Sequence, residues 1–247
     1  MASWLLAVVF APFIGSFIGV VTARWERPRT IVTGRSACLQ CGHPLAPRDL
    51  VPLASWLAAR GRCRYCDGPI ALRYPAIELA ALGVAAWAAL VVPDWAMWHS
   101  VAFGWVLLAL AVVDLEHYVL PDFLTLPLLL GGLAQGWTMQ PDEISARLLG
   151  SAAGFLFVVA LRFAYQRLRG REGIGLGDAK LLGALGAWVG WAGLPTVLLV
   201  ASLLGLGVAL VRGQLRKGSL ADRVPFGAYL CVGAWIVWLH GPFTFMD

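Results

Sequence analysis

The stretch "LLGALGAWVGW" at residues 181–191 contains no charged residue, and it follows directly on "REGIGLGDAK" at residues 171–180. An uncharged apolar run of this kind is typical of a membrane helix. Asp178 stands at the entrance of the run, and an ionisable group at the membrane edge is by default a candidate for function. The stretch therefore predicts a membrane protein with chemistry near one membrane face.

The composition of the whole chain agrees with this prediction. Of its 247 residues, 60% are hydrophobic and 13% are charged, whereas about 25% of the residues in a soluble domain are charged. The formal net charge of +5 would favour nucleic-acid binding in a soluble protein. Here the basic residues flank apolar segments, so we expect the lipid bilayer as a partner and no nucleic acid.

We predict an all-α polytopic membrane protein with about eight transmembrane helices. The first apolar run is followed, not preceded, by basic residues, which indicates an uncleaved helix with its N-terminus outside the cell membrane. On that topology all but one of the 19 basic residues lie on the cytoplasmic side, as the positive-inside rule requires, and the exception is Arg147. The apolar segments lie near residues 3–22, 74–92, 96–114, 122–138, 147–164, 178–192, 195–211 and 225–240.

One extramembrane region, residues 23–73, is long enough to fold by itself. It contains "CLQCGHPL" and "CRYCDGPI", two CxxC pairs separated by 21 residues. This spacing is typical of a closed structural zinc site, a zinc-ribbon-like insertion after the first helix. Two disulfides are the alternative, but thiols stay reduced in the cytoplasm. The predicted zinc ligands are Cys38, Cys41, Cys63 and Cys66.

Two further residues could join this chemistry, but each has a simpler interpretation. His43 could replace a thiolate at the zinc, although a solvated loop histidine fits the sequence better. Cys231 stands alone in the last apolar run and is interpreted as a small buried hydrophobic residue. We therefore expect zinc to be held by the four paired cysteines.

Carboxylates gather at two predicted membrane edges that share the cytoplasmic face. Asp114 ends the third apolar segment and Asp178 begins the sixth, 64 residues later. Two carboxyl groups at the same depth could share one proton, so that the ionised group activates water while the protonated one polarises a peptide carbonyl. Gly175 and Gly177, with Gly173, would let the backbone approach a substrate strand closely. The neighbouring Asp122 follows a proline and is expected to cap its helix.

Taken together, these motifs resemble the type IV prepilin peptidases, bacterial inner-membrane aspartic proteases of the GxGD type. The resemblance runs from about residue 15 to 230. It rests on "GSF" at 15–17, "DLVPLASWLAARGRCRYC" at 49–66, "RYPAIEL" at 73–79, "DLEHYVLPD" at 114–122, "GIGLGDAKLLGALGAWVGW" at 173–191 and "VPFGAYL" at 224–230.

The resemblance implies an endopeptidase that removes the basic leader from type IV prepilins or pseudopilins at the cytoplasmic face, serving pili or type II secretion. Its catalytic aspartates fall on Asp114 and Asp178. Many members also methylate the new N-terminus with S-adenosylmethionine, using the region of the cysteine loop. The implied organisation is a first helix over residues 1–22, a cytoplasmic zinc-binding region over 23–73 and a transmembrane peptidase domain over 74–247.

The chain departs from the family pattern where the first helix usually reads G-S-F-L-N-V. Here the sequence is "GSFIGV", with Gly19 at the asparagine position, and the proline that usually follows the next arginine is displaced to Pro28. This leaves a peptidase with weak or absent methyltransferase activity as an alternative. Glu116 and Asp122 are suggested as neighbours for the basic leader.

Three alternatives come from other classes of protein. A transporter would use the same carboxylates as ion sites, but it predicts polar residues deep in several helices, and Glu78 is the main candidate. A membrane scaffold would explain the cysteines but not the GxGD motif. A metal-dependent hydrolase would use Asp114, His117 and Asp178, which are few ligands for that chemistry.

Overall fold

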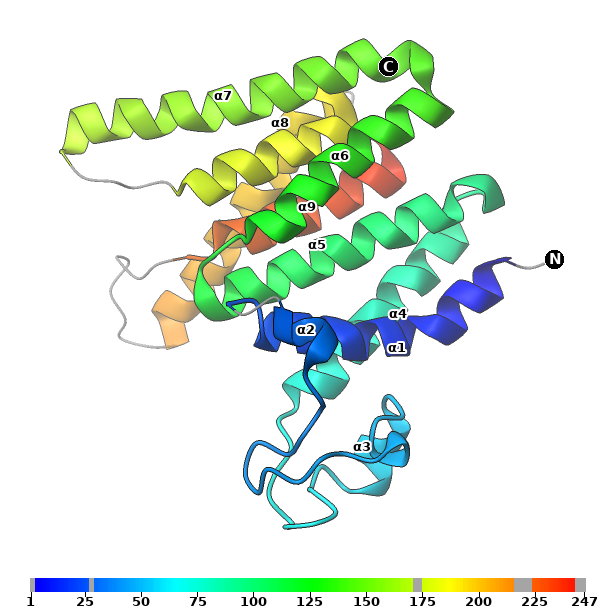
Figure 1. The fold of residues 1–247 in the computed structure, drawn as a ribbon. Helices are drawn as coiled ribbons and strands as arrows, with labels where there is room; N and C mark the ends of the chain where they lie inside the picture. Colours follow the sequence, from blue (N-terminus) through cyan, green and yellow to red (C-terminus); the bar gives the residue numbers. More distant parts are fainter. Residues whose placement is uncertain (1–2, 27–28, 171–174, 216–223, 243–247) are drawn as a thin grey trace. The chain divides into compact units, whose positions relative to one another are not determined.

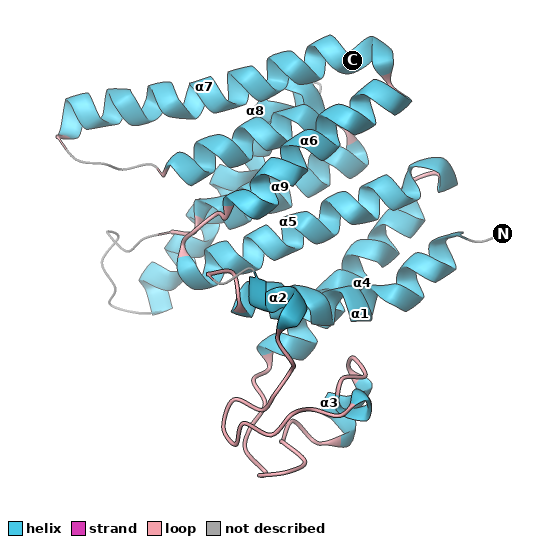
Figure 2. Cartoon of the chain, in the orientation of Figure 1, coloured by secondary structure: helices cyan, strands magenta, loops and turns pink. Residues whose placement is uncertain are grey.

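The structure, a computed structural model, is described for residues 3–26, 29–170, 175–215 and 224–242. The described residues form helices and loops, with no β-strand among them (Figure 2). The all-α prediction is therefore confirmed for this part of the chain. Pro28 and Gly173, considered above, lie outside the described residues.

In the part of the chain that the structure describes, seven long helices account for the predicted apolar segments (Figure 1). The sixth and seventh predicted segments are joined in one helix, α8, which is interrupted at Gly190 by a positive φ of 67°. Glycine tolerates this backbone conformation because it has no Cβ. The helices are α1 (Ser3–Ala23), α4 (Arg73–Val91), α5 (Met97–His117), α6 (Asp122–Met139), α7 (Ile144–Arg169), α8 (Leu176–Leu215) and α9 (Phe226–His240).

Five segments among the described residues are long and apolar enough to cross a membrane, although the predicted count of eight is not established. Each spans at least 18 residues, which matches the thickness of a bilayer core. α9 is apolar but shorter. The five segments are Trp4–Ala23, Arg73–Val91, Asp94–His117, Pro141–Arg169 and Leu176–Val211.

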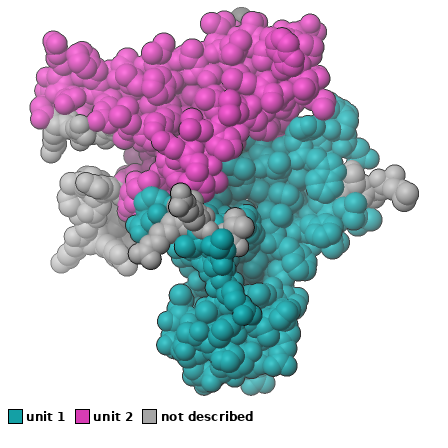
Figure 3. Space-filling view, in the orientation of Figure 1, with its two compact units in different colours: residues 1–109 teal, residues 110–247 magenta. Residues whose placement is uncertain are grey.

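The chain divides into two compact units, Met1–Ala109 and Leu110–Asp247 (Figure 3). In the first unit α1 packs against α4. Gly15 permits this contact, since a Cβ at that position would lie 2.6 Å from the Cα of Glu78. The segment between these helices, residues 35–72, forms a small body that we call the cysteine lobe. It contains α3 (Ala54–Ala58) and the short 3-10 helix η1 (Pro47–Asp49), and a second short helix, α2 (Arg29–Thr33), precedes it.

In the second unit α8 is the central helix and contacts α6, α7 and α9. Glycines allow α7 and α8 to approach closely, because a Cβ on Gly186 would come within 2.2 Å of the carbonyl oxygen of Gly150. Close backbone approach through small residues is the usual way that membrane helices pack. Trp188 of α8 adds a polar contact by donating its indole N–H to the carbonyl oxygen of Leu128 in α6 at 2.8 Å.

Arg147, the single exception to the predicted charge distribution, is an internal residue with 2% of its surface exposed. Its guanidinium donates to the side-chain oxygens of Gln135, at 2.7 Å, and Gln140. A buried cation needs such partners. Arg147 departs from the predicted distribution of basic residues for a structural reason. It links α6 to α7 inside the protein and is not one of the basic residues that flank an apolar segment.

Candidate active site

Asp114 lies one turn before the end of α5 and is buried, with 5% of its surface exposed. Its Oδ2 accepts a hydrogen bond of 2.8 Å from the backbone N–H of Ala228, in the first turn of α9. Gly227 leaves room for the carboxylate, because a Cβ there would lie 3.0 Å from the same oxygen. The start of α9 thus fixes the orientation of Asp114, as helix N-termini commonly do for anions.

Asp178 is the third residue of α8 and lies close enough to Asp114 for their charges to interact. The backbone of Gly175 donates a hydrogen bond to this carboxylate. A Cβ at Gly175 would lie 3.5 Å from Oδ2 of Asp178, in ordinary van der Waals contact with the carboxylate. The structure therefore brings together two carboxylates that are 64 positions apart in the sequence.

Two apolar side chains complete the surroundings of the aspartates. Cys231 of α9 is buried, as the sequence predicted, and it is close enough to both carboxylates to sense their charges. Leu120 lies between the helix starts, 3.3 Å from where a Cβ of Gly177 would be and 2.9 Å from that of Gly227.

The roles of Gly227, Ala228 and Leu120 were missed by sequence reasoning. Gly227 and Ala228 lie in "VPFGAYL", where a proline precedes a glycine at the start of an apolar helix, and Leu120 lies in "DLEHYVLPD". The hydrogen bond to Asp114 nevertheless joins residues 114 positions apart. Local patterns cannot predict such a pairing.

The expectation that Asp122 caps its helix is wrong. The N-cap of α6 is Pro121, and Asp122 is the first residue inside the helix. Its carboxylate instead accepts two hydrogen bonds from Nζ of Lys180, at 2.7 and 2.8 Å. A cation two residues after Asp178 competes with a helix cap, and the ion pair joins the start of α6 to the start of α8.

The two carboxylates suggested as neighbours of a basic leader therefore have different partners. Asp122 is occupied by Lys180. Oε2 of Glu116 lies 3.8 Å from Nε2 of His117. The structure brings His117 next to Glu116 in a surface pair.

The four cysteines of the lobe converge, as their spacing predicted. Their Sγ atoms all lie within 4.8 Å of one another, and those of Cys38 and Cys66 are 3.8 Å apart. Tetrahedral zinc with Zn–S bonds of about 2.3 Å requires sulfur atoms roughly 3.8 Å apart. The donor set therefore fits zinc. His43 stacks on Tyr65 with ring centroids 3.7 Å apart.

The two CxxC pairs adopt the same turn. The N–H of Gly42 donates to the carbonyl of Cys38 at 2.9 Å, and the N–H of Asp67 donates to that of Cys63 at 2.9 Å. Gly42 and Asp67 both have positive φ, 69° and 57°. Backbone N–H groups of Cys41 and Gln40 also lower the pKa of the Cys38 thiol to about 6, which favours a thiolate at neutral pH. Because the two CxxC pairs share this turn, each pair places its two thiolates on one side of the backbone.

Asp49 ties the second turn to the rest of the lobe. Its carboxylate accepts hydrogen bonds of 3.0 Å from Nε of Arg64 and 3.0 Å from the hydroxyl of Tyr65. Desolvation acts to raise the pKa of Asp49, but the donors Tyr65, Ala46 and Arg64 outweigh it, so the pKa lies below the usual range. The lobe is therefore held by polar contacts as well as by its cysteines.

These features define a class of protein: a helical membrane protein with two interacting carboxylates, one buried and one half-buried, and a four-cysteine lobe. Residues 9–92 match the bacterial peptidase A24 N-terminal domain, and residues 101–210 match the type IV leader peptidase family. The chain belongs to this family.

Curated relatives agree with the assignment over nearly the whole chain. A prepilin leader peptidase/N-methyltransferase of Aeromonas hydrophila is 40% identical, covering 96% of this chain and 92% of the relative. The proteins of the same name from Burkholderia pseudomallei strain K96243 and Pseudomonas aeruginosa strain PAO1 are 40% and 33% identical, over 92% and 98% of this chain and 82% and 91% of theirs. No solved structure matches the chain. Neither a transporter nor a peptidase without methyltransferase activity is favoured by these names.

Proposed function

We propose that the protein is a membrane aspartic endopeptidase that removes the leader of type IV prepilins or pseudopilins and then methylates the new N-terminus. The observation that carries the peptidase assignment is the pair Asp114 and Asp178, which come from two helices and interact in a partly buried site. The names of the relatives support both activities.

In the proposed mechanism the two carboxyl groups share one proton. The ionised group takes a proton from water, which attacks the peptide carbonyl, and the protonated group polarises the carbonyl oxygen. The proton then passes to the leaving amine. Gly175 and Gly177, at the start of α8, allow the extended substrate backbone to lie beside the pair.

We further propose that Cys38, Cys41, Cys63 and Cys66 hold one structural zinc. Four thiolates leave no open coordination position, so the metal stabilises the lobe and takes no part in hydrolysis. In this proposal residues 1–22 form the first transmembrane helix, residues 23–73 form the zinc-binding region and residues 74–247 contain the peptidase site. When S-adenosylmethionine is bound, it supplies the methyl group.

The proposed location is the bacterial inner membrane, with the N-terminus in the periplasm and the aspartates at the cytoplasmic face. The distribution of basic residues along the sequence supports this orientation. The burial of Arg147 removes the one exception. This orientation would bring the aspartates to the side on which a prepilin presents its basic leader.

The test is incubation of the purified protein in lipid with a prepilin and S-adenosylmethionine, followed by mass spectrometry of the pilin. We expect a mature chain that begins after the leader, with one added methyl group. A pilin of unchanged mass would contradict the peptidase assignment. A mature but unmethylated pilin would contradict the second activity alone.

A further inference from the structure

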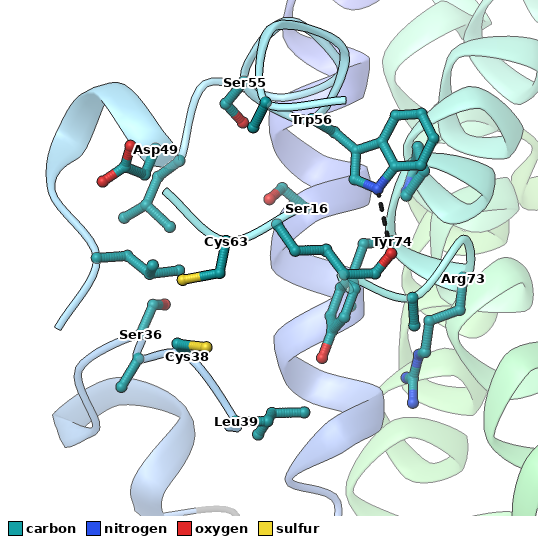
Figure 4. Close-up of a pocket in the computed structure, with 18 of the residues that line it drawn as sticks. Ser16, Ser36, Cys38, Leu39, Asp49, Ser55, Trp56, Cys63, Arg73 and Tyr74 are labelled. Atoms are coloured by element: carbon teal, nitrogen blue, oxygen red, sulfur yellow. Dashed lines mark hydrogen bonds between the residues drawn. The ribbon is translucent and has the colours of Figure 1, made fainter. Parts of the chain in front are cut away.

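A cavity of about 420 Å³ lies between the cysteine lobe and the helix pair α1 and α4 (Figure 4). Cavities that bind small molecules usually measure about 300–1,000 Å³. The lining includes Ser16 and Gly19 from α1, Trp56 from the lobe, and Tyr74 and Glu78 from α4. All of these residues belong to the first unit. Neither aspartate of the candidate peptidase site lines the cavity.

Aromatic side chains form part of its wall. Trp56 is held in place by donating its indole N–H to the carbonyl oxygen of Ile70 at 3.4 Å, the bond drawn in Figure 4. Tyr74 is half-buried, and the guanidinium of Arg73 lies 5.4 Å from the centre of its ring. Such rings provide stacking surfaces for a nucleobase and attract cations to their faces.

The same cavity also carries charges of both signs. Glu78 is buried, with 6% of its surface exposed, and its Oε2 accepts a hydrogen bond of 2.7 Å from the N–H of Leu53. A carboxylate has further lone pairs with which to accept an ammonium group. Arg73 also lines the cavity and suits a carboxylate. A ligand that combines a zwitterionic amino acid, a cationic centre and a nucleobase would satisfy all of these groups.

Gly19, the residue at which the sequence departs from its family, lies in the wall of this cavity. A Cβ at this position would be 3.4 Å from Cδ1 of Tyr74, an ordinary van der Waals contact. An alanine therefore fits, whereas a large side chain would occupy the space beside the tyrosine ring. The departure at Gly19 leaves this space open.

We propose that this cavity is the binding site for S-adenosylmethionine, with Trp56 and Tyr74 against its adenine and sulfonium groups and Glu78 and Arg73 towards its amino-acid end. The inference rests on the proposed methyltransferase function. In the transfer, the amine nitrogen of the mature pilin forms a bond to the methyl carbon. The bond from sulfur to methyl breaks, its electron pair stays on sulfur as a neutral thioether, and the positive charge passes to the nitrogen, which releases one proton to water.

The test compares two tryptophan substitutions in the full-length, zinc-loaded protein in lipid. Gly19→Trp fills the cavity, whereas Gly83→Trp on α4 is the matched control, because a Cβ at Gly83 has no neighbour within 4 Å. Equilibrium binding of radiolabelled S-adenosylmethionine is measured beside leader cleavage. We expect Gly19→Trp to weaken binding by at least about tenfold while cleavage continues, and Gly83→Trp to bind like the original protein.

Unchanged binding by Gly19→Trp would overturn the inference, as would equal weakening by Gly83→Trp. If Gly19→Trp also fails to cleave, Tyr74→Ala and Glu78→Gln decide: weaker binding with cleavage retained supports the site, and unchanged binding overturns it. An unsubstituted protein that cleaves prepilin but binds no S-adenosylmethionine also overturns it. Failure of the proposed peptidase function would appear differently, as binding without cleavage by the unsubstituted protein.

Discussion

At the residue scale, the aspartate pair depends on neighbours that come from another helix. Asp114 is held by the first turn of α9 through the N–H of Ala228, while Asp178 is contacted by the backbone of Gly175. The two carboxylates therefore have different partners. Unequal surroundings are what allow two like groups to take separate acid and base roles.

The ion pair between Asp122 and Lys180 leads to a prediction about activity. Both side chains are about half exposed, at 55% and 42%, and such pairs contribute about 0–1 kcal/mol. We expect Asp122→Asn and Lys180→Met each to lower the rate of prepilin cleavage by less than about fivefold. Because they break the same contact, the double variant should be no slower than either single one.

The measurement is the initial rate of leader cleavage by each purified variant. Charge exchange provides the control, since Asp122→Lys combined with Lys180→Asp should restore the contact in reverse. An inactive Asp122→Asn variant would contradict this view and would move Asp122 into the catalytic site.

At the scale of elements, the contact between α7 and α8 depends on glycine. Gly186→Leu would force a side chain against the carbonyl oxygen of Gly150, which lies 2.2 Å from the position of the Cβ. Overpacking of this kind costs about 1–3 kcal/mol, which corresponds to a melting temperature lower by roughly 2–12 °C. Thermal unfolding of the purified protein in detergent measures this change in melting temperature.

Gly207→Leu is the matched control, since it lies on the same helix and a Cβ there has no neighbour within 4 Å. It should melt within about 2 °C of the original protein. Equal melting temperatures for Gly186→Leu and Gly207→Leu would show that close packing at Gly186 is unimportant.

The cysteine lobe supports a prediction about metal content. Purified protein should contain about one zinc per chain. Cys38→Ser or Cys66→Ser should lower that content and make residues 35–72 more sensitive to protease, because the four sulfur atoms hold the two turns together. Metal analysis and limited proteolysis measure both effects, and Cys231→Ser serves as the control that keeps its zinc. Full zinc occupancy in the quadruple serine variant would exclude the site.

Much of the fold at this scale could be predicted from the sequence. Apolar runs placed the long helices, and the two CxxC pairs placed the cluster, because both signals are local. The sequence separated two segments at residues 192–195, and the structure has a non-helical break nearby, at Gly190, where glycine permits the positive φ. The capping role assigned to Asp122 failed because Lys180 is distant in sequence, and the contact of Ala228 with Asp114 was missed for the same reason.

At the scale of the whole molecule, the placement of charge and the placement of chemistry agree. In the proposed orientation the basic residues mark the cytoplasmic side of the membrane, and both aspartates fall at helix ends on that side. The exception, Arg147, is buried and bound by Gln135 and Gln140. A site at the membrane edge suits a substrate with a membrane helix and a basic leader, because the bond to be cut lies between them.

The most direct test of the account is prepilin cleavage by Asp114→Asn, Asp178→Asn and the double variant in lipid. An amide keeps the size of the carboxylate but cannot exchange the proton, and residues that act as one unit lose activity together. We predict that each single variant is as inactive as the double one, with zinc content and membrane insertion unchanged. Substantial cleavage by either single variant would contradict the account.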